Sequence, residues 1–245
     1  MENITTAEGR EEELLSHMQE GRFVMERNNS AISSCTFGTA ITYNSSWLYD
    51  GAKRLLDIVL SVIGLVVLLP VFLVIAVCIK LEDRGDILYF REMIGLRGRS
   101  FSILKFRTMM PNADAYLEEH PELEQEYQKS MKLQDDPRIT RVGRFLRKTY
   151  LDELPQLFNV LVGQMSFVGP RAIHQRELLL YGEYAEKRHS VKPGVTGLWQ
   201  ISPDRHRCYE DRIPLDMKYI EDRSLFLDLV ILLKTPRVFI MATGV

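Results

Sequence analysis

The sequence predicts an α+β protein held at a membrane by one apolar helix, with amphipathic helices at the interface and a small β-hairpin beside its functional site. Three observations predict this class. Residues 58–79 contain no charged side chain, two short apolar stretches flank a glycine-containing turn, and the segments after them are helical in pattern. With 245 residues, 46% of them hydrophobic, the chain can bury one good core, and its formal net charge of −2 argues against a general nucleic-acid binder.

The first part of the chain, residues 1–46, is predicted to be a mobile polar N-terminal extension. It is rich in Glu, Ser, Thr and Asn and has no sustained hydrophobic periodicity. The acidic run Glu11-Glu12-Glu13 stands where a cleaved export signal would need a basic start and an apolar core, which argues against such a signal.

The apolar stretch from Ile58 to Ile79 would be ~33 Å long as a straight helix, enough to cross a ~30 Å hydrocarbon core. Pro70 divides it into halves that are too short to span, because proline removes a backbone donor and clashes with the preceding turn. Two arrangements remain open. One is a kinked spanning helix, which the residues alone slightly favour because membranes tolerate such kinks, and the other is a helix-break-helix hairpin within one leaflet. Cations on both sides leave the orientation unassigned. They are Lys53, Arg54, Lys80 and Arg84.

Two short strands are predicted next, at residues 87–90 and 101–106, around the turn Gly95-Leu96-Arg97-Gly98. Cations follow or end both strands: Arg91 the first, Lys105 and Arg107 the second. We therefore expect a β-hairpin that carries basic side chains.

The two following segments have opposite charge. Residues 111–136 are helical and strongly acidic, and their one histidine, His120, has no metal-ligand spacing, which indicates a solvated face rather than a metal site. In residues 138–148, arginines recur at every third position beside apolar side chains, so a helix here carries a cationic stripe. Such a stripe suits both an anionic membrane surface and phosphate binding. We expect Arg147 to be the best phosphate ligand of the stripe, because it lies closest in sequence to the next motif.

That motif is the adjacent pair Asp152 and Glu153, at a predicted helix start with Pro155 in the first turn. The ordinary interpretation is that Asp152 caps the helix. The chemical interpretation is that the helix N-terminus stabilises an ionised carboxylate and an incoming phosphate together. Adjacent carboxylates can also hold a divalent metal, so a nucleophile-and-base pair is the alternative to a simple cap.

Near the end of the chain, residues 225–233 are apolar apart from Asp228, and Lys234, Pro236 and Arg237 follow. The stretch is too short to span a bilayer. It predicts a helix at the membrane interface.

Several motifs follow one another along the chain. They are Lys53-Arg54-Leu55-Leu56-Asp57, Lys105-Phe106-Arg107-Thr108-Met109, Asp136-Pro137-Arg138-Ile139-Thr140, Asp152-Glu153, Gly169-Pro170-Arg171 and Lys192-Pro193-Gly194-Val195-Thr196-Gly197-Leu198-Trp199-Gln200. In this order they resemble the bacterial sugar transferases, the monotopic polyprenyl-phosphate phosphoglycosyl transferases. The resemblance covers about residues 50 to 240 and lacks the multi-helix N-terminal part of larger relatives, so the chain resembles the minimal catalytic form.

The resemblance implies transfer of a sugar 1-phosphate from a UDP-sugar to polyprenyl (undecaprenyl) phosphate, with release of UMP, at the start of cell-surface glycan assembly. In that family the aspartate matching Asp152 is the covalent nucleophile, the glutamate matching Glu153 supports it as a base or through the metal, and Mg²⁺ is needed, with Asp152 as its ligand. The resemblance also implies a re-entrant membrane helix within 47–84, broken at Pro70. The catalytic domain, 85–245, would then lie on the cytoplasmic face of the bacterial cytoplasmic membrane.

Basic positions carry over as ligands that neutralise diphosphate charge. They are Lys105, Arg107, Arg138, Arg147 and Arg171, with Pro170 in the Pro-Arg motif that the family uses for the nucleotide. Two positions depart from the family pattern: Ala172 stands where a second proline is usual, and Gln164 replaces an acidic residue.

The implied partners are a UDP-sugar, polyprenyl phosphate and the lipid bilayer, and a homo-oligomer is compatible with the sequence. Two other functions stay open on the residues alone. One is a membrane-bound hydrolase of nucleotide-sugar diphosphates, in which water resolves the aspartyl intermediate. The other is a non-catalytic module that binds lipid phosphates. The sequence names neither the sugar nor the glycan.

Overall fold

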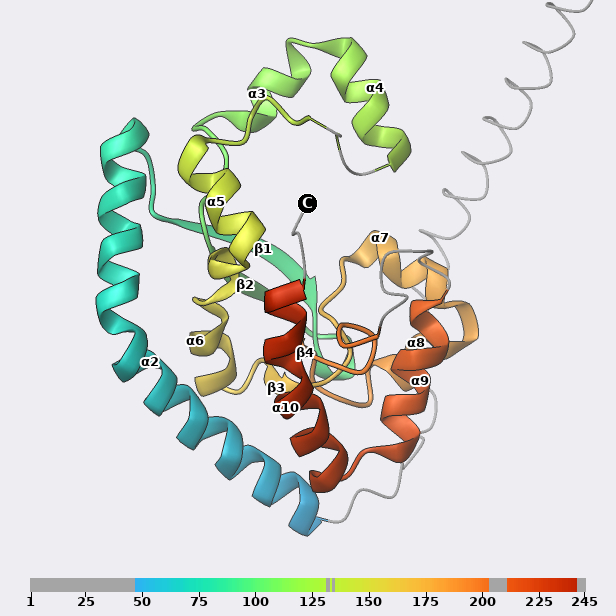
Figure 1. The fold of residues 1–245 in the computed structure, drawn as a ribbon. Coiled ribbons are helices and arrows are strands. Elements are labelled where there is room, and N and C mark those ends of the chain that lie inside the picture. Colours follow the sequence, from blue (N-terminus) through green and yellow to red (C-terminus); the bar gives the residue numbers. More distant parts are fainter. Residues whose placement is uncertain (1–46, 131–132, 134, 203–210, 242–245) are drawn as a thin grey trace, which may run out of the picture. The chain divides into compact units, whose positions relative to one another are not determined.

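The computed structural model describes residues 47–130, 133, 135–202 and 211–241, and the predicted mobile extension 1–46 lies outside them. In this part of the chain a long helix comes first, a β-hairpin and four α-helices follow, and short helices then connect the strands of a second, two-stranded sheet (Figure 1). Two further helices complete the described part. This mixture of helices and strands confirms the predicted α+β class.

The first described element, α2 (Trp47–Asp83), is one helix of 37 residues that is long and apolar enough to cross a membrane. Its buried side chains are Asp57, Ser61, Ile75 and Ile79, whose spacing places them on one side of the helix. The other side exposes apolar residues, from Val59 through Val66 to Val77. One side of α2 therefore faces the protein, and the other presents the apolar surface predicted for contact with lipid.

The structure does not confirm the predicted break at Pro70. The proline lies inside α2, and the helix continues on both sides of it. A proline removes one N–H and bends a helix, while the hydrogen bonds of the neighbouring residues remain. Figure 1 shows α2 changing direction along its length. Loss of one backbone donor therefore does not end this helix.

The predicted hairpin is confirmed. Strand β1 (Leu88–Ile94) pairs antiparallel with β2 (Ser100–Phe106), so that Leu88 lies opposite Phe106. The connection contains a single 3₁₀ turn, η1 (Leu96–Gly98). The first strand extends to Ile94 instead of ending at residue 90, because the pairing continues up to the turn.

The acidic segment forms two helices instead of one. They are α3 (Ala113–Glu118) and α4 (Pro121–Ser130). Proline restricts the residue before it and is well tolerated at the first position of a helix, so Pro121 separates the two. The predicted basic helix is confirmed as α5 (Arg141–Thr149), and the Thr140 hydroxyl caps it by accepting a 2.9 Å hydrogen bond from the N–H of Gly143.

The second half of the chain is built around a short parallel pair of strands, β3 (Ser166–Val168) and β4 (Gly194–Thr196). Glycine is required where these strands meet the preceding loop, since a Cβ atom on Gly194 would overlap the backbone of Gly169. The elements between and after the strands are α7 (Gln175–Leu178), η3 (Leu179–Tyr184), α8 (Ala185–Arg188), α9 (Arg212–Asp222) and α10 (Leu225–Met241). Helix α10 confirms the predicted C-terminal helix and extends it.

Three clusters of buried apolar side chains form the core. One includes Val168 of β3, Tyr219 of α9 and Ile231 of α10. A second joins the hairpin to α6 (Gln156–Leu161), and a third joins α2 to α5 and the hairpin. Hydrophobic burial thus fixes the helix α2 against the rest of the described unit.

Polar contacts hold the beginning of α2. The Lys53 ammonium lies 2.6 Å from the carboxylate of Asp228, which is buried in α10. The Arg54 guanidinium donates two 2.7 Å hydrogen bonds to the last carbonyl groups of α6. The Asp57 carboxylate accepts from the N–H of Phe167 at 2.9 Å. Three charged residues of one motif thus reach three different elements.

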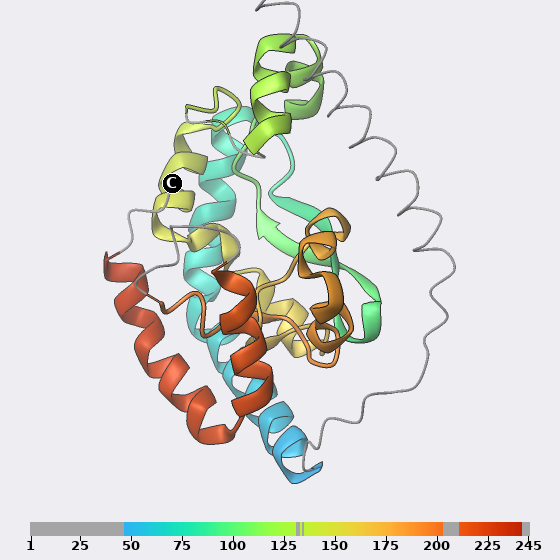
Figure 2. The same cartoon turned by 90° about the vertical axis from the view of Figure 1, so that its right-hand side faces the viewer.

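Polar contacts also hold the end of α2. The Glu82 carboxylate accepts from the N–H groups of Arg141, at 2.7 Å, and Val142, at 3.1 Å, at the start of α5. Asp83 forms an ion pair with Arg107, just after β2. Both ends of α2 are therefore attached to the same folded unit (Figure 2).

Candidate active site

Asp152 and Glu153 lie in η2 (Leu151–Glu153), a single 3₁₀ turn between α5 and α6. Helix α5 ends because Tyr150 adopts the left-handed conformation, with φ 56°, and the chain changes direction just before the pair. The capping interpretation of Asp152 is wrong, because α6 begins only at Gln156 and Asp152 makes no cap hydrogen bond. The tight turn instead presents both carboxylates to the hairpin.

Basic side chains from two other segments meet this pair. The Nζ atom of Lys105, on β2, is 2.6 Å from Oε1 of Glu153 and 3.8 Å from Oδ2 of Asp152. A guanidinium nitrogen of Arg171, after β3, is 3.5 Å from the same Glu153 oxygen. The structure therefore brings together four residues that the sequence analysis selected.

The two carboxylates have different electrostatic environments. Burial raises the pKa of Asp152, and the charge of Glu153 adds to this rise, while Lys105 and Arg147 oppose it. Burial would also raise the pKa of Glu153, but Lys105 and Arg171 outweigh it and lower that pKa to about 2. Glu153 is thus a permanently ionised partner of the cations, whereas Asp152 is the more basic carboxylate.

Arg147 approaches the site from the last turn of α5. Its Nε atom donates a 2.9 Å hydrogen bond to the hydroxyl of Thr108, and the rest of its guanidinium lies in the field of Asp152. Burial lowers the pKa of Arg147, and the nearby carboxylates partly restore it. Arg147 therefore lies beside the carboxylate pair, and its role as the phosphate ligand of the basic helix stays a prediction.

Two other predicted phosphate ligands do not join the cluster. The Arg107 guanidinium donates to the carboxylate of Asp83 and to the carbonyl of Met109. Arg138 is 3% exposed and pairs with Asp136 through two hydrogen bonds of 2.8 and 2.7 Å. Each arginine is held by a carboxylate close to it in the fold, so in this structure both are structural ion pairs.

Buried arginines hold the backbone of the Pro170-Arg171 motif by hydrogen bonds. The carbonyl of Pro170 accepts from the N–H of Gly194 at 2.9 Å. The carbonyl of Arg171 accepts from Arg188 and from Arg212, each at 2.7 Å, and both of these side chains are buried. They orient the backbone that presents the Arg171 side chain to Glu153.

The sequence analysis missed Arg188 and Arg212 because nothing in their neighbourhood marks an arginine as buried. It also missed Gln156, which is 3% exposed and hydrogen-bonds to Glu153. The position of Gln156 three residues after Glu153, at the start of a helix, is the one signal that could have pointed to it.

The residues present fit a sparse magnesium site. No group of three or more His, Cys, Asp or Glu side chains that could hold a metal occurs among the residues that the structure describes. Mg²⁺, however, needs only one or two protein carboxylates, since substrate phosphates and water complete its shell. Asp152 suits that role better than Glu153, whose carboxylate is engaged by Lys105.

A carboxylate pair surrounded by basic side chains, on a unit that carries a long apolar helix, is the arrangement expected of a membrane-associated enzyme that acts on phosphate esters. The model of the family described as bacterial sugar transferase matches residues 48–242. The chain therefore belongs to the bacterial sugar transferase family, and the resemblance noted in the sequence is confirmed.

Individual relatives agree with this assignment. The chain is 45% identical over 188 residues to the exopolysaccharide production protein ExoY of Sinorhizobium fredii, covering 75% of this chain and 83% of that protein. It is 41% identical over 196 residues to the undecaprenyl-phosphate galactose phosphotransferase of Salmonella typhimurium, covering 78% and 41%. It is 38% identical over 193 residues to the UDP-glucose:undecaprenyl-phosphate glucose-1-phosphate transferase of Klebsiella pneumoniae, covering 75% and 39%. The chain thus spans most of the first relative and less than half of the other two.

Proposed function

We propose that this protein transfers a sugar 1-phosphate from a UDP-sugar to undecaprenyl phosphate and releases UMP, as a first step in the assembly of an exopolysaccharide or related glycan. The printed activities of the Salmonella and Klebsiella relatives support the reaction class. The observation that carries the proposal is the pair of adjacent carboxylates with opposite pKa shifts. Burial raises the pKa of Asp152, whereas Lys105 and Arg171 lower the pKa of Glu153 and keep it ionised.

In the proposed mechanism the ionised carboxylate of Asp152 attacks the phosphorus that bears the sugar. A bond forms from a carboxylate oxygen to phosphorus, and the bond from phosphorus to the UMP oxygen breaks, so that UMP leaves with the electron pair. An oxygen of the lipid phosphate then attacks the same phosphorus and displaces Asp152, which regains its charge. Covalent catalysis of this kind divides one displacement into two easier ones.

The basic residues supply charge where it develops. Lys105 lies between both carboxylates, and Arg171 and Arg147 approach from other sides, so an incoming diphosphate meets fixed cations. A carboxylate whose pKa is about 2 is a weak base near neutral pH. We therefore assign Glu153 mainly to holding Lys105 and Arg171 in place.

The proposal includes a requirement for Mg²⁺, held by an oxygen of Asp152 with Glu153 beside it. When bound, the ion would reduce the repulsion between the substrate diphosphate and the carboxylates. Titration of the enzyme with EDTA and restoration with Mg²⁺ would check this requirement, and unchanged turnover after removal of divalent ions would contradict it.

The covalent step has a direct test. After mixing with UDP-sugar and Mg²⁺ in the absence of undecaprenyl phosphate, the wild-type protein should release about one UMP per active site and carry a hexose phosphate on the peptide that contains Asp152, as seen by intact-protein and peptide mass spectrometry. Asp152→Asn should show neither, while Asp222→Asn, which changes an exposed carboxylate at the end of α9, should behave as wild type.

Other outcomes have defined meanings. The absence of both burst and adduct, together with intersecting double-reciprocal plots, would favour direct attack by the lipid phosphate. Continuous release of UMP and free sugar phosphate without undecaprenyl phosphate would indicate a hydrolase. No UMP release under any condition from a folded protein would indicate a binding module.

We also propose that α2 enters and leaves the cytoplasmic leaflet. The support is its attachment at both ends to the same folded unit, through Lys53 and Asp57 near one end and Glu82 and Asp83 at the other. A helix that crosses the bilayer would separate its ends by ~30 Å of hydrocarbon, with one end on each side. Polar groups of one unit cannot hold both ends in that case.

Accessibility labelling in intact cells tests this topology. Asp50→Cys and Arg84→Cys, each made in a variant without the three native cysteines, should both resist an impermeant thiol reagent added from outside and both react after lysis. Labelling of only one of them from outside would restore the spanning arrangement.

A further inference from the structure

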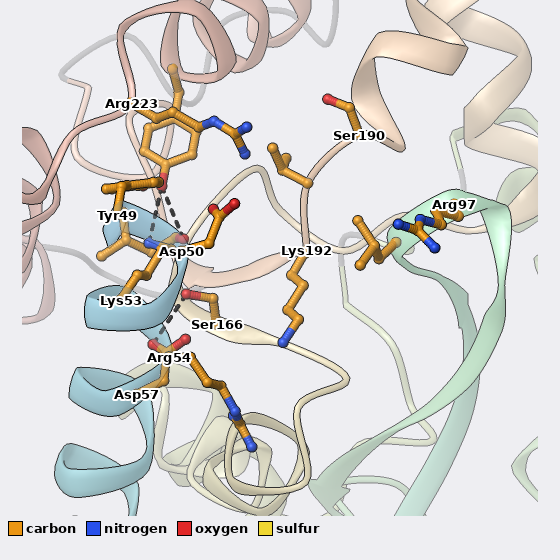
Figure 3. Close-up of a pocket in the computed structure, with 14 residues that line it drawn as sticks. Tyr49, Asp50, Lys53, Arg54, Asp57, Arg97, Ser166, Ser190, Lys192 and Arg223 are labelled. Atoms are coloured by element: carbon orange, nitrogen blue, oxygen red, sulfur yellow. Dashed lines mark hydrogen bonds between the residues drawn. The ribbon is translucent and has the colours of Figure 1, made fainter. Parts of the chain in front are cut away.

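A hollow of about 350 Å³, drawn in Figure 3, borders β3, and neither member of the dyad of Asp152 and Glu153 lines it. Met165 faces the cleft that contains Glu153 and Arg171, whereas the next residue, Ser166, lines this hollow. Met165 directly precedes β3 and Ser166 begins it, so the start of this strand borders both sites. The hollow is also bordered by the first turns of α2, by η1 and by the end of α9.

The lining is basic. It contains five cations and two carboxylates. Three of these charges serve the fold: Lys53 pairs with Asp228, and Arg54 and Asp57 bond to backbone groups. Among the described residues, the remaining cations form no ion pair and no side-chain hydrogen bond. They are Arg97, Lys192 and Arg223, which come from three separate segments of the chain.

Lys192 is half-buried, whereas Arg97 is exposed. Figure 3 shows its side chain extending into the hollow, with Arg97 on the opposite wall and Arg223 above α2. Burial lowers the pKa of Lys192 and the neighbouring charge of Arg54 lowers it further, whereas the carboxylates of Asp57 and Asp50 act in the opposite direction. Three cations around one hollow repel each other, and an anion between them would offset that repulsion.

The position of the hollow relates it to the membrane. Its lining on α2 runs from Tyr49 to Asp57 and stops one residue before the uncharged stretch that begins at Ile58. Trp47 is 80% exposed at the end of the same helix, and tryptophan is typical of the headgroup level. If residues 58–79 insert as in the proposed function, the hollow opens among lipid headgroups.

From this geometry we propose that the hollow is a second phosphate-binding site, separate from the dyad, in which Lys192 and Arg97 hold the phosphate group of a lipid headgroup. The chemistry it recognises is a phosphate mono- or diester, because ammonium and guanidinium groups provide point and forked donors for such oxygens. A hollow of this size accepts a headgroup and leaves the acyl or prenyl chain outside. The assignment to a lipid rests on the proposed membrane insertion of α2.

The test uses the full chain in a non-ionic detergent, with thermal unfolding as the readout of ligand binding. Three probes distinguish the sources of phosphate: inorganic phosphate, dihexanoylphosphatidylglycerol below its micellar concentration, and farnesyl phosphate. We expect Lys192→Gln and Arg97→Gln each to weaken binding of the lipid probes about tenfold, the usual effect of losing one charged hydrogen bond. Lys192→Arg should keep most of the affinity, which separates charge from folding.

The matched control is Lys218→Gln, which removes an exposed cation from α9 and should bind as wild type. Tighter binding of a lipid probe than of inorganic phosphate identifies a headgroup, and equal binding identifies free phosphate as the source. Affinities that are the same in wild type, Lys192→Gln and Arg97→Gln would overturn the site. All measurements are repeated in Asp152→Asn, where binding that depends on Lys192 should persist, so failure of the catalytic proposal remains distinguishable.

Discussion

The side-chain amide of Asn159 hydrogen-bonds to backbone groups at the edge of β2 that does not pair with β1. Its removal should lower the stability of this strand and disturb the active site beside it. Its amide nitrogen donates to the carbonyl of Ser102 at 2.8 Å and to the side chain of Gln164 at 2.7 Å. Its amide oxygen accepts from the N–H of Leu104 at 2.9 Å. Asn159 is 0% exposed. In β2, Leu104 is followed by Lys105, which forms ion pairs with both carboxylates of the site.

Asn159→Leu keeps the volume and removes all three hydrogen bonds. At about 1 kcal/mol for each, the folded unit should lose about 3 kcal/mol. For a unit of this size that corresponds to a fall in the unfolding midpoint of about 6–12 °C. The strand edge also loses its register with α6, so transfer activity should fall at temperatures where the protein is still folded.

The assay is thermal unfolding in detergent beside initial rates of UMP release. Gln164→Ala is the matched control, since it removes one of the three hydrogen bonds from an exposed partner and should lower the midpoint by only about 2–4 °C. If Asn159→Leu melts within the error of Gln164→Ala and turns over normally, the amide does not hold the strand.

Three further predictions follow from individual contacts. Lys105 lowers the pKa of Asp152, so Lys105→Gln should raise that pKa and move the acid limb of kcat/KM to higher pH, and a limb that stays in place would contradict the assigned electrostatics. Gly143→Ala should destabilise by about 3 kcal/mol or more in thermal unfolding because its Cβ would overlap a backbone carbonyl, whereas Gly51→Ala, with open space around it, should be neutral or slightly stabilising. Asp228→Asn should cost about 3 kcal/mol by leaving its half-buried lysine partner on α2 without a counter-charge, and a second substitution of that lysine by methionine should recover part of the loss in a double-mutant cycle.

Elements with a local signature were predictable from the sequence. The hairpin was recognised because two apolar stretches flank a glycine turn, and α5 because its arginines and apolar residues repeat with helical spacing. The long apolar helix was found from the absence of charge alone. Its continuity through Pro70 was one of two arrangements that the residues left open, because whether a proline ends or only bends a helix depends on the packing of its neighbours.

The choice of Asp152 and Glu153 as the catalytic pair stays a prediction, and their local structure was not predicted. The sequence suggested a helix cap, whereas the left-handed conformation of Tyr150 produces a separate 3₁₀ turn. Tyrosine rarely adopts that conformation, so no residue preference announces it. The pairing of Arg138 with Asp136, two residues away, was readable in principle as a local ion pair, and it removes that arginine from the list of free phosphate ligands.

Contacts between segments far apart in the chain could not be predicted from the sequence. Arg212 reaches the carbonyl of Arg171 from 41 residues further along the chain, and the side chain of Asp57 meets the N–H of Phe167 across 110 residues. Such pairings depend on the path of the whole chain, and neither the spacing nor the chemistry of the residues specifies it.

The attachment of α2 has a consequence for how the protein folds during its synthesis. The helix is synthesised first among the described elements, yet Lys53 must wait for Asp228, which is added 175 residues later. At ribosomal speeds of about 5–20 residues per second, that interval lasts roughly 10–35 seconds. During this time the unpaired side of α2 carries exposed charges and the other side is apolar. Insertion into lipid buries the apolar side and prevents its aggregation. Early membrane insertion would therefore protect α2 until α10 has been synthesised and the ion pair can form.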